Sequence, residues 1–187
     1  MTITAGNSRA SWLGRASAAL LLLAAATRGD LAGDAARAFR RPEPLLRAET
    51  LDALRMRLGA ADRLERNKVA AAVEKGLRKE GLAEVRLAAA RLLFALHTGR
   101  ALDRLVVTAL DPREEVRAWL RERVAAQADA QLQEAIVRAL RDDASWRLRA
   151  SMADLLLAGA WDTARAPLLG ALSDPHPAVV ARAAEAL

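Results

Sequence analysis

Apolar side chains recur at helical spacing in two runs, from residue 102 to 110 and from residue 116 to 124. Asp111 and Pro112 separate the two runs. Proline cannot continue the first helix but fits the opening turn of the next, and the aspartate before it can cap the N–H groups of that turn. The pattern therefore predicts two helices joined by a sharp turn.

This arrangement occurs four times at a nearly constant period. An apolar anchor residue follows each acidic turn, and the four anchors are spaced 31, 32 and 31 residues apart: Val85, Val116, Leu148 and Val179. The acidic residues of the four turns are Glu80, Asp111, Asp142 or Asp143, and Asp174. A helix pair of this size cannot bury its apolar face alone, so successive pairs must stack. The sequence therefore predicts an all-α fold, arranged as an α-solenoid.

Three segments carry a resemblance to a known family: Ala109–Pro112, Glu115–Arg117 and Ala171–Val179. They resemble the short HEAT-like repeat found in many bacterial and organellar proteins. The resemblance implies a right-handed α-solenoid of about five antiparallel helix pairs, in which the second helix of each pair lines a concave binding surface. The sequence departs from the family pattern at Val180, where arginine is expected, and at Glu80, where the Asp-Pro turn is replaced.

The predicted organisation has three parts. Residues 62–187 form four HEAT-like repeats, at about 62–98, 99–128, 129–160 and 161–187. Residues 30–61 form a degenerate first helix pair, and residues 1–29 form an N-terminal apolar and basic helix or a targeting segment. The second helix of the last repeat is predicted to be short, from near His176 to Leu187. Either the array is cut there, or a partner or a second copy of the chain covers that end.

Residues 1–29 allow three interpretations. An eleven-residue apolar run from Ala16 to Ala26 follows Arg9 and Arg15, as in a secretory signal. The lack of acidic residues and the serine and threonine content are also typical of an organellar transit peptide. The third interpretation is an additional packed helix, which favours a cytoplasmic protein. A membrane span needs about 20 apolar residues, so we do not expect one.

The composition supports helices and argues against a sheet. Alanine contributes 46 residues and leucine 32, whereas valine and isoleucine together contribute 12. Alanine and leucine are strong helix formers, and strands need branched and aromatic side chains, of which the aromatic ones make up only 3% of the chain. The absence of cysteine excludes disulfides, thiolate metal sites and a cysteine nucleophile.

The formal charge of +6 lies in the first half of the chain. Residues 1–93 contain 17 basic and 10 acidic residues, whereas residues 94–187 contain 12 and 13, a net charge of −1. A strongly basic protein often binds nucleic acid or an anionic surface. Because the half with the clearest repeats is nearly neutral, we do not expect nucleic acid as the partner.

The sequence contains no motif for a catalytic, cofactor-binding or metal-binding site. It has no glycine-rich phosphate loop, no nucleophile elbow and no His-Glu-x-x-His helix. The two histidines are predicted at the end of a helix (His97) and in a turn (His176), without carboxylates at ligand spacing. We therefore expect no cofactor.

Seven residues form the candidate interaction surface: Arg86, Arg117, Arg121, Arg149, Trp119, Trp146 and Trp161. Three of the arginines directly follow apolar anchors, so we expect them on the same side of successive second helices. They could bind an acidic peptide or phosphate, or they could pair with the acidic turns inside the array, which is the preferred interpretation. The tryptophans either anchor a partner or fill the gaps between stacked helix pairs.

We expect a non-enzymatic scaffold or adaptor that binds another protein along its concave face or through its ends. The alternatives are an enzyme on the same scaffold, since HEAT-like proteins include alkylpurine DNA glycosylases and bilin lyases, or a nucleic-acid-binding module. A glycosylase needs a basic groove across several repeats. A bilin lyase needs a pocket with acidic and aromatic groups. Neither feature is evident in the sequence.

Overall fold

The computed structural model describes residues 29–126, 129–159 and 161–187. Within these ranges every regular element is a helix, and no strand occurs. The predicted all-α class is therefore confirmed for the described part of the chain. The three interpretations of the N-terminal segment concern residues 1–28, which lie outside the described residues, and they stay predictions.

Ten α-helices occur in the described ranges. The first five are α2 (Leu31–Ala38), α3 (Pro44–Met56), α4 (Arg63–Leu77), α5 (Ala83–Leu96) and α6 (Gly99–Val106). The other five are α7 (Glu114–Ala126), α8 (Ala130–Asp142), α9 (Trp146–Gly159), α10 (Arg165–Ala171) and α11 (Pro177–Ala186). Three short 3₁₀ helices accompany them: η1 (Leu58–Ala60), η2 (Val107–Leu110) and η3 (Asp162–Ala164).

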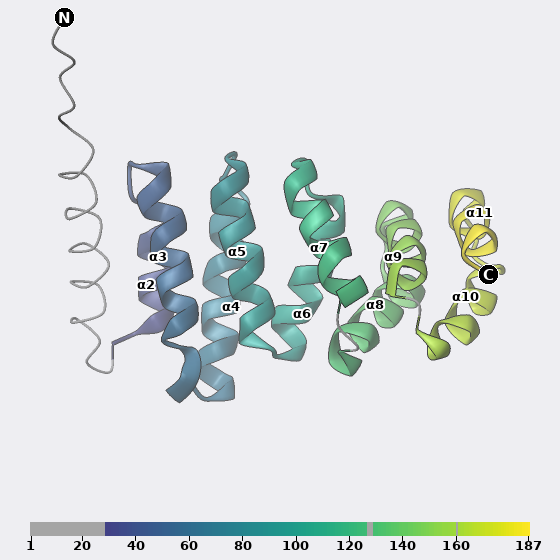
Figure 1. Ribbon diagram of the computed structural model, residues 1–187, viewed down its shortest axis with the longest axis horizontal. Helices are drawn as coiled ribbons and strands as arrows, with labels where there is room; N and C mark the ends of the chain where they lie inside the picture. Colours follow the sequence, from purple (N-terminus) through teal and green to yellow (C-terminus); the bar gives the residue numbers. More distant parts are fainter. Residues whose placement is uncertain (1–28, 127–128, 160) are drawn as a thin grey trace, which may run out of the picture.

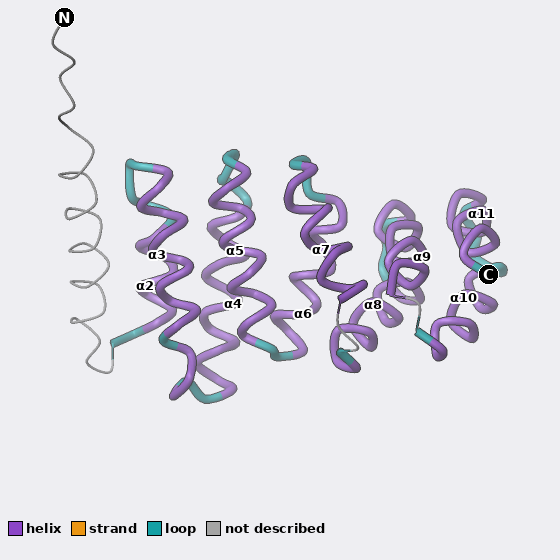
Figure 2. Tube along the Cα trace, viewed as in Figure 1, coloured by secondary structure: helices purple, strands orange, loops and turns teal. Residues whose placement is uncertain are grey.

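The helices follow one another in a row, from α2 and α3 at one end to α10 and α11 at the other (Figure 1). Short loops join them throughout the described ranges (Figure 2). Contacts run in two series, α2–α4–α6–α8–α10 and α3–α5–α7–α9–α11. The main contacts of each helix are therefore with helices that are first or second neighbours along the chain.

Side-chain caps begin four of the helices in the first series. The Asp62 carboxylate accepts a hydrogen bond from the Glu65 N–H at 2.8 Å, and the Asp129 carboxylate accepts from the Gln131 and Leu132 N–H groups at 3.0 Å. Asp30 and Thr98 cap α2 and α6 in the same way. These caps pair N–H groups that have no partner inside a helix, so the polar sequence between apolar runs fixes where the helices begin.

The core is built from leucine, alanine and valine. All four predicted anchors are buried, with exposed fractions of 0 to 3% for Val85, Val116, Leu148 and Val179. Alanines 88–90 and 135, on α5 and α8, are also buried. The abundance of alanine and leucine thus corresponds to close helix packing, since small residues allow approach and leucines fill the space between.

Candidate interaction surface

Arg86 joins three segments of the chain. Its Nε atom donates to both carboxylate oxygens of Asp111, at 3.0 and 2.8 Å, and its Nη2 atom donates to Oδ2 at 2.5 Å. Its Nη1 atom donates to the backbone carbonyls of Leu77 and Glu80, at 2.8 and 2.7 Å. The Arg86 and Asp111 side chains are only 14% and 2% exposed. All three guanidinium nitrogens are therefore engaged within the protein.

Arg149 makes the equivalent contact further along the chain. We call this contact, in which an arginine pairs with the carboxylate of a turn between two later helices, a joint. Its Nε and Nη2 atoms donate to the two carboxylate oxygens of Asp174, at 2.7 and 2.9 Å, and Nη1 donates to the Asp143 carbonyl at 2.8 Å. The hydrogen bond from Arg149 holds the pKa of Asp174 below its usual value, and burial opposes this shift. Asp174 also accepts from the His176 N–H at 2.8 Å, so it caps the turn and joins two helix pairs at once.

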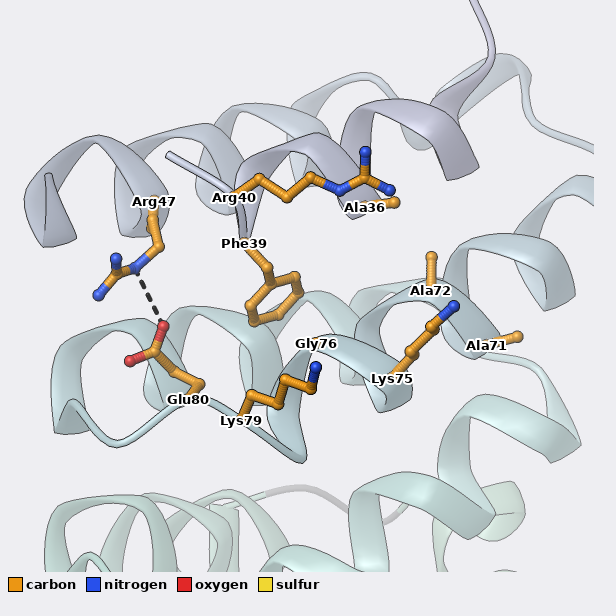
Figure 3. Close-up of a pocket in the computed structure, with 10 residues that line it drawn as sticks. All are labelled: Ala36, Phe39, Arg40, Arg47, Ala71, Ala72, Lys75, Gly76, Lys79 and Glu80. Atoms are coloured by element: carbon orange, nitrogen blue, oxygen red, sulfur yellow. Dashed lines mark ion pairs between the residues drawn. The ribbon is translucent and has the colours of Figure 1, made fainter. Parts of the chain in front are cut away.

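A third joint lies in the N-terminal part, where the sequence pattern was weakest. The Arg47 Nε atom lies 3.0 Å from Glu80 Oε2, and the two side chains are 16% and 6% exposed (Figure 3). Glu80 Oε1 accepts from the Leu82 N–H at 3.0 Å, just as Asp174 accepts two residues ahead. Glu80 thus takes the place of the turn aspartate. Arg47 pairs with it by charge, while its described hydrogen bonds run from Nη1 to the Arg41 and Pro42 carbonyls.

The joint is missing at one position. Arg117 pairs with Glu114 on its own helix and donates to the Asp111 carbonyl, and among the described residues no ion pair connects it to Asp143. Asp143 is nevertheless the residue that caps the turn between α8 and α9, because its carboxylate accepts from the Ser145 N–H at 2.8 Å. This settles the choice that the sequence left open between Asp142 and Asp143. Within the described ranges the contact between α7 and α9 therefore lacks the ion pair that the other joints have.

Arg121 belongs to the same helix as Arg117 and faces solvent. Its Nη2 atom lies 2.5 Å from Glu114 Oε1, and its side chain is 49% exposed. Hydrogen bonds from Arg121 and Arg117 hold the pKa of the Glu114 carboxyl below its usual value. Of the four arginine side chains in the predicted surface, that of Arg121 is the most exposed.

Trp119 lies on α7 and packs against α5. Its ring meets the Phe94 ring edge-on, with centroids 6.3 Å apart and an angle of 83° between the planes. The Arg123 guanidinium lies 5.5 Å from the Phe94 centroid and 5.6 Å from that of Trp119. Trp119 is half-buried against the core, which favours the packing interpretation.

The other two predicted tryptophans are also half-buried. Trp146 stacks on the His176 imidazole, with centroids 4.0 Å apart and 4° between the planes. Trp161 packs against the core beside Gly159, where a Cβ atom would lie 2.8 Å from the indole ring. The three tryptophans thus fill space between elements and do not gather in one exposed patch.

The two histidines contact helix ends. His97 ends α5 in the left-handed region with φ 46°, and its Nδ1 atom lies 3.5 Å from Asp129 Oδ2. His176 Nδ1 accepts from the Ala178 N–H at 3.2 Å and so caps α11. Within the described residues no group of three or more histidine, aspartate or glutamate side chains is arranged to hold a metal ion.

A cleft between α2 and α4 was not predicted from the sequence. It has a volume of about 560 Å³. Its lining residues are Ala36, Phe39, Arg40, Arg47, Ala71, Ala72, Lys75, Gly76, Lys79 and Glu80 (Figure 3). The floor is apolar, and the exposed polar groups at its rim are cationic.

The sequence does carry a signal for this cleft. Lysine occurs only three times among 29 basic residues, at positions 68, 75 and 79. Intervals of seven and four residues are those of one stripe of a helix, and in the structure Lys68 and Lys75 lie on α4 while Lys79 lies in the turn that follows it. All three are exposed. Only the placement of α2 beside α4, however, adds Arg40 and Phe39 to that stripe.

Comparisons with known proteins do not identify a family. No protein-family model matches the chain, and no curated protein is significantly similar to it. Of the helices in the described ranges, none combines the length and apolar character needed to cross a membrane. The function is therefore argued from the geometry of the chain itself.

Proposed function

We propose that this protein is a non-enzymatic interaction scaffold, built as a right-handed α-solenoid of HEAT-like repeats that binds another protein. The observation that carries the proposal is the recurring joint between an arginine and the turn carboxylate of the following helix pair. It occurs at Arg47–Glu80, Arg86–Asp111 and Arg149–Asp174. A joint repeated in this way supports a stacked array, because at each of these three contacts an arginine of one helix pair meets the turn carboxylate of the next.

The use of the polar side chains supports binding over catalysis. Bidentate arginine–carboxylate pairs fix geometry strongly, and here they are occupied in holding helix pairs together. The two histidines cap or contact helix ends. An extended surface with an open cleft is the form in which repeat proteins hold partners.

Affinity capture tests the proposal. The full chain is immobilised and exposed to extract of the native source, and captured proteins are identified by mass spectrometry. We expect one or a few proteins to be enriched. As a control, a variant with Leu120→Asp, which buries a charge in the core, should capture none of them because the array no longer packs. Equal capture by both proteins would count against a folded binding surface.

The enzyme alternative makes a different prediction. Purified protein, free of partners, would release alkylated bases from DNA or transfer a bilin to an acceptor protein. Either activity would overturn the scaffold proposal. A nucleic-acid-binding module would instead retain duplex DNA with a steep dependence on salt, losing about 10³-fold or more in affinity between 50 and 200 mM salt for six or more phosphate contacts.

A further inference from the structure

We infer that the cleft between α2 and α4 binds an acidic segment of a partner protein, with an apolar side chain of that segment seated on Phe39. This inference rests on the proposed function and specifies where the partner binds and what its chemistry is. Two properties of the cleft carry it, the apolar floor and the cationic rim.

The floor is shaped to receive an apolar group. It combines the Phe39 ring with the methyl groups of Ala36, Ala71 and Ala72. Gly76 lies directly beneath the ring, where a Cβ atom would be 2.2 Å from Phe39 Cδ2. The ring is thus held against the backbone of α4, and the small residues around it leave the space open (Figure 3).

The rim carries positive charge without exposed carboxylates. Arg40, Lys75 and Lys79 are exposed, and none of them forms an ion pair with another described residue. The two other charged groups that line the cleft, Arg47 and Glu80, neutralise each other and are 16% and 6% exposed. Figure 3 shows the ends of Lys75 and Lys79 turned toward the space between the helices. The cleft therefore presents three net positive charges to an occupant.

Charge complementarity selects an acidic occupant, and the floor selects a peptide. A nucleic-acid strand gains affinity from many phosphate contacts along a groove, and three cations offer few. Bases stack on exposed aromatic faces, whereas Phe39 is half-buried against Gly76. A peptide with carboxylates on both sides of a leucine matches both the rim and the floor.

Fluorescence polarisation with defined peptides tests the inference. The probe is a fluorescein-labelled peptide made of two Glu-Glu-Leu-Glu-Glu blocks. Two matched probes replace glutamate by lysine or leucine by serine. We expect the full chain to bind the first probe, to bind the leucine-to-serine probe at least about fivefold more weakly, and not to bind the lysine probe.

Matched protein variants locate the binding. Lys75→Glu with Lys79→Glu should weaken binding of the acidic probe by at least about tenfold. The control, Arg100→Glu with Arg165→Glu, changes the net charge equally at exposed positions outside the cleft and should leave binding within about twofold of the original. Lys75→Arg with Lys79→Arg should retain it. Circular dichroism checks that each variant is folded.

Several outcomes would overturn the inference. Equal losses in the two charge-reversed variants would show attraction by net charge alone. Displacement of the probe by inorganic phosphate, or by single-stranded DNA at lower concentration than unlabelled peptide, would identify an anion or nucleic-acid site instead. Failure of the full chain to bind the acidic probe would also remove the cleft as a peptide site.

The same variants separate this inference from the proposed function. If the Lys75→Glu, Lys79→Glu variant captures from native extract the same partner as the original chain, the cleft assignment fails and the scaffold proposal stands. If the original chain captures no protein while the acidic probe still binds at the cleft, the scaffold proposal fails and the cleft remains an acidic-peptide site.

Discussion

Gly76 shows how one residue can fix the position of a helix. It is the penultimate residue of α4, where alanine would ordinarily be preferred by about 0.5–1 kcal/mol. The Phe39 ring, however, occupies the space that a side chain would need, with atoms 2.2 to 2.5 Å from an ideal Cβ. Glycine therefore allows the chain that follows α2 to pack directly on α4.

We expect Gly76→Ala to lower the free energy of unfolding by about 1–2 kcal/mol, because the cost of overpacking exceeds the gain in helix propensity. Gly170 is the matched control, since it is also the penultimate residue of its helix and a Cβ there meets nothing within 4 Å. Gly170→Ala should instead raise the free energy by about 0.5–1 kcal/mol. Urea denaturation measures both, and stabilisation by Gly76→Ala would contradict the packing described.

Asp174 makes the stability of the protein depend on pH. The hydrogen bond from Arg149 places the pKa of Asp174 in the folded protein below its ordinary value of 3.8. A carboxyl with a lowered pKa stabilises the fold fully above its unfolded pKa. That contribution is lost as the pH falls through the folded pKa.

We expect Asp174→Asn to be less stable than the original chain at pH 7, with the difference shrinking as the pH falls below about 4. Urea denaturation at pH 7, 4 and 2.5 follows the difference. Asp162→Asn, which removes an exposed carboxyl without an ion pair among the described residues, should leave stability nearly unchanged. A difference between Asp174→Asn and the original chain that stays constant with pH would exclude the ion pair as its source.

At the level of elements, the joints differ in how they hold neighbouring helices. Arg86 bonds to the carbonyls of Leu77 and Glu80, near the end of α4, and to Asp111 before α7. Among the described residues Arg117 bonds only to Asp111, three residues before α7, and to Glu114 within it. Arg86 and Arg117 occupy equivalent positions in the sequence, but Arg86 connects different helices whereas Arg117 stabilises the start of its own helix.

We expect Arg86→Ala to lower the free energy of unfolding by about 3 kcal/mol, because it leaves the buried Asp111 carboxylate without its partner. Arg117→Ala should cost about 1 kcal/mol or less, since its carboxylate partner is exposed. Thermal and urea denaturation of the two variants provide the comparison. Equal losses would mean that Arg117 also joins two helix pairs in solution.

The arginine–carboxylate pairing between helices was predictable from the sequence in part. Arginine after three of the four anchors and acid in each turn suggested the pairs that Arg86 and Arg149 form. Arg47 was missed because it lies 33 residues before Glu80, whereas Arg86 and Arg149 lie 25 residues before their partners. Arg47 keeps the contact but not the spacing, so no periodic pattern could indicate it.

For the whole molecule, periodicity carried more information than composition. The 31- and 32-residue spacing indicated the anchors, and these are buried. The cleft, in contrast, forms only because α2 and α4 lie side by side. Phe39 and Lys75 are 36 residues apart, and no pattern in the sequence relates them. The distribution of charge placed the excess of basic residues in the first half of the chain, where the cleft lies, but it did not indicate the position of the cleft.

We expect the molecule to divide between α7 and α9, where the described residues form no joint. Because the main contacts connect only first or second neighbours along the chain, the row can open between two neighbouring helices of a series without opening elsewhere. The α5 to α7 and α9 to α11 contacts are each reinforced by an ion pair of the joint type, Arg86–Asp111 and Arg149–Asp174. The α7 to α9 contact has none among the described residues, so it is the expected point of division.

Amide hydrogen exchange at increasing urea concentrations tests this division. We expect α8 to α11 to lose protection together at a lower urea concentration than α4 and α5, because α5 contributes the largest run of buried leucines and alanines. Arg86→Ala should lower the concentration at which α4 and α5 exchange and leave that of α9 and α11 in place, since it weakens only the α5 to α7 joint. Loss of protection in one step throughout both proteins would show that the missing ion pair does not divide the row, and that packing alone couples its two parts.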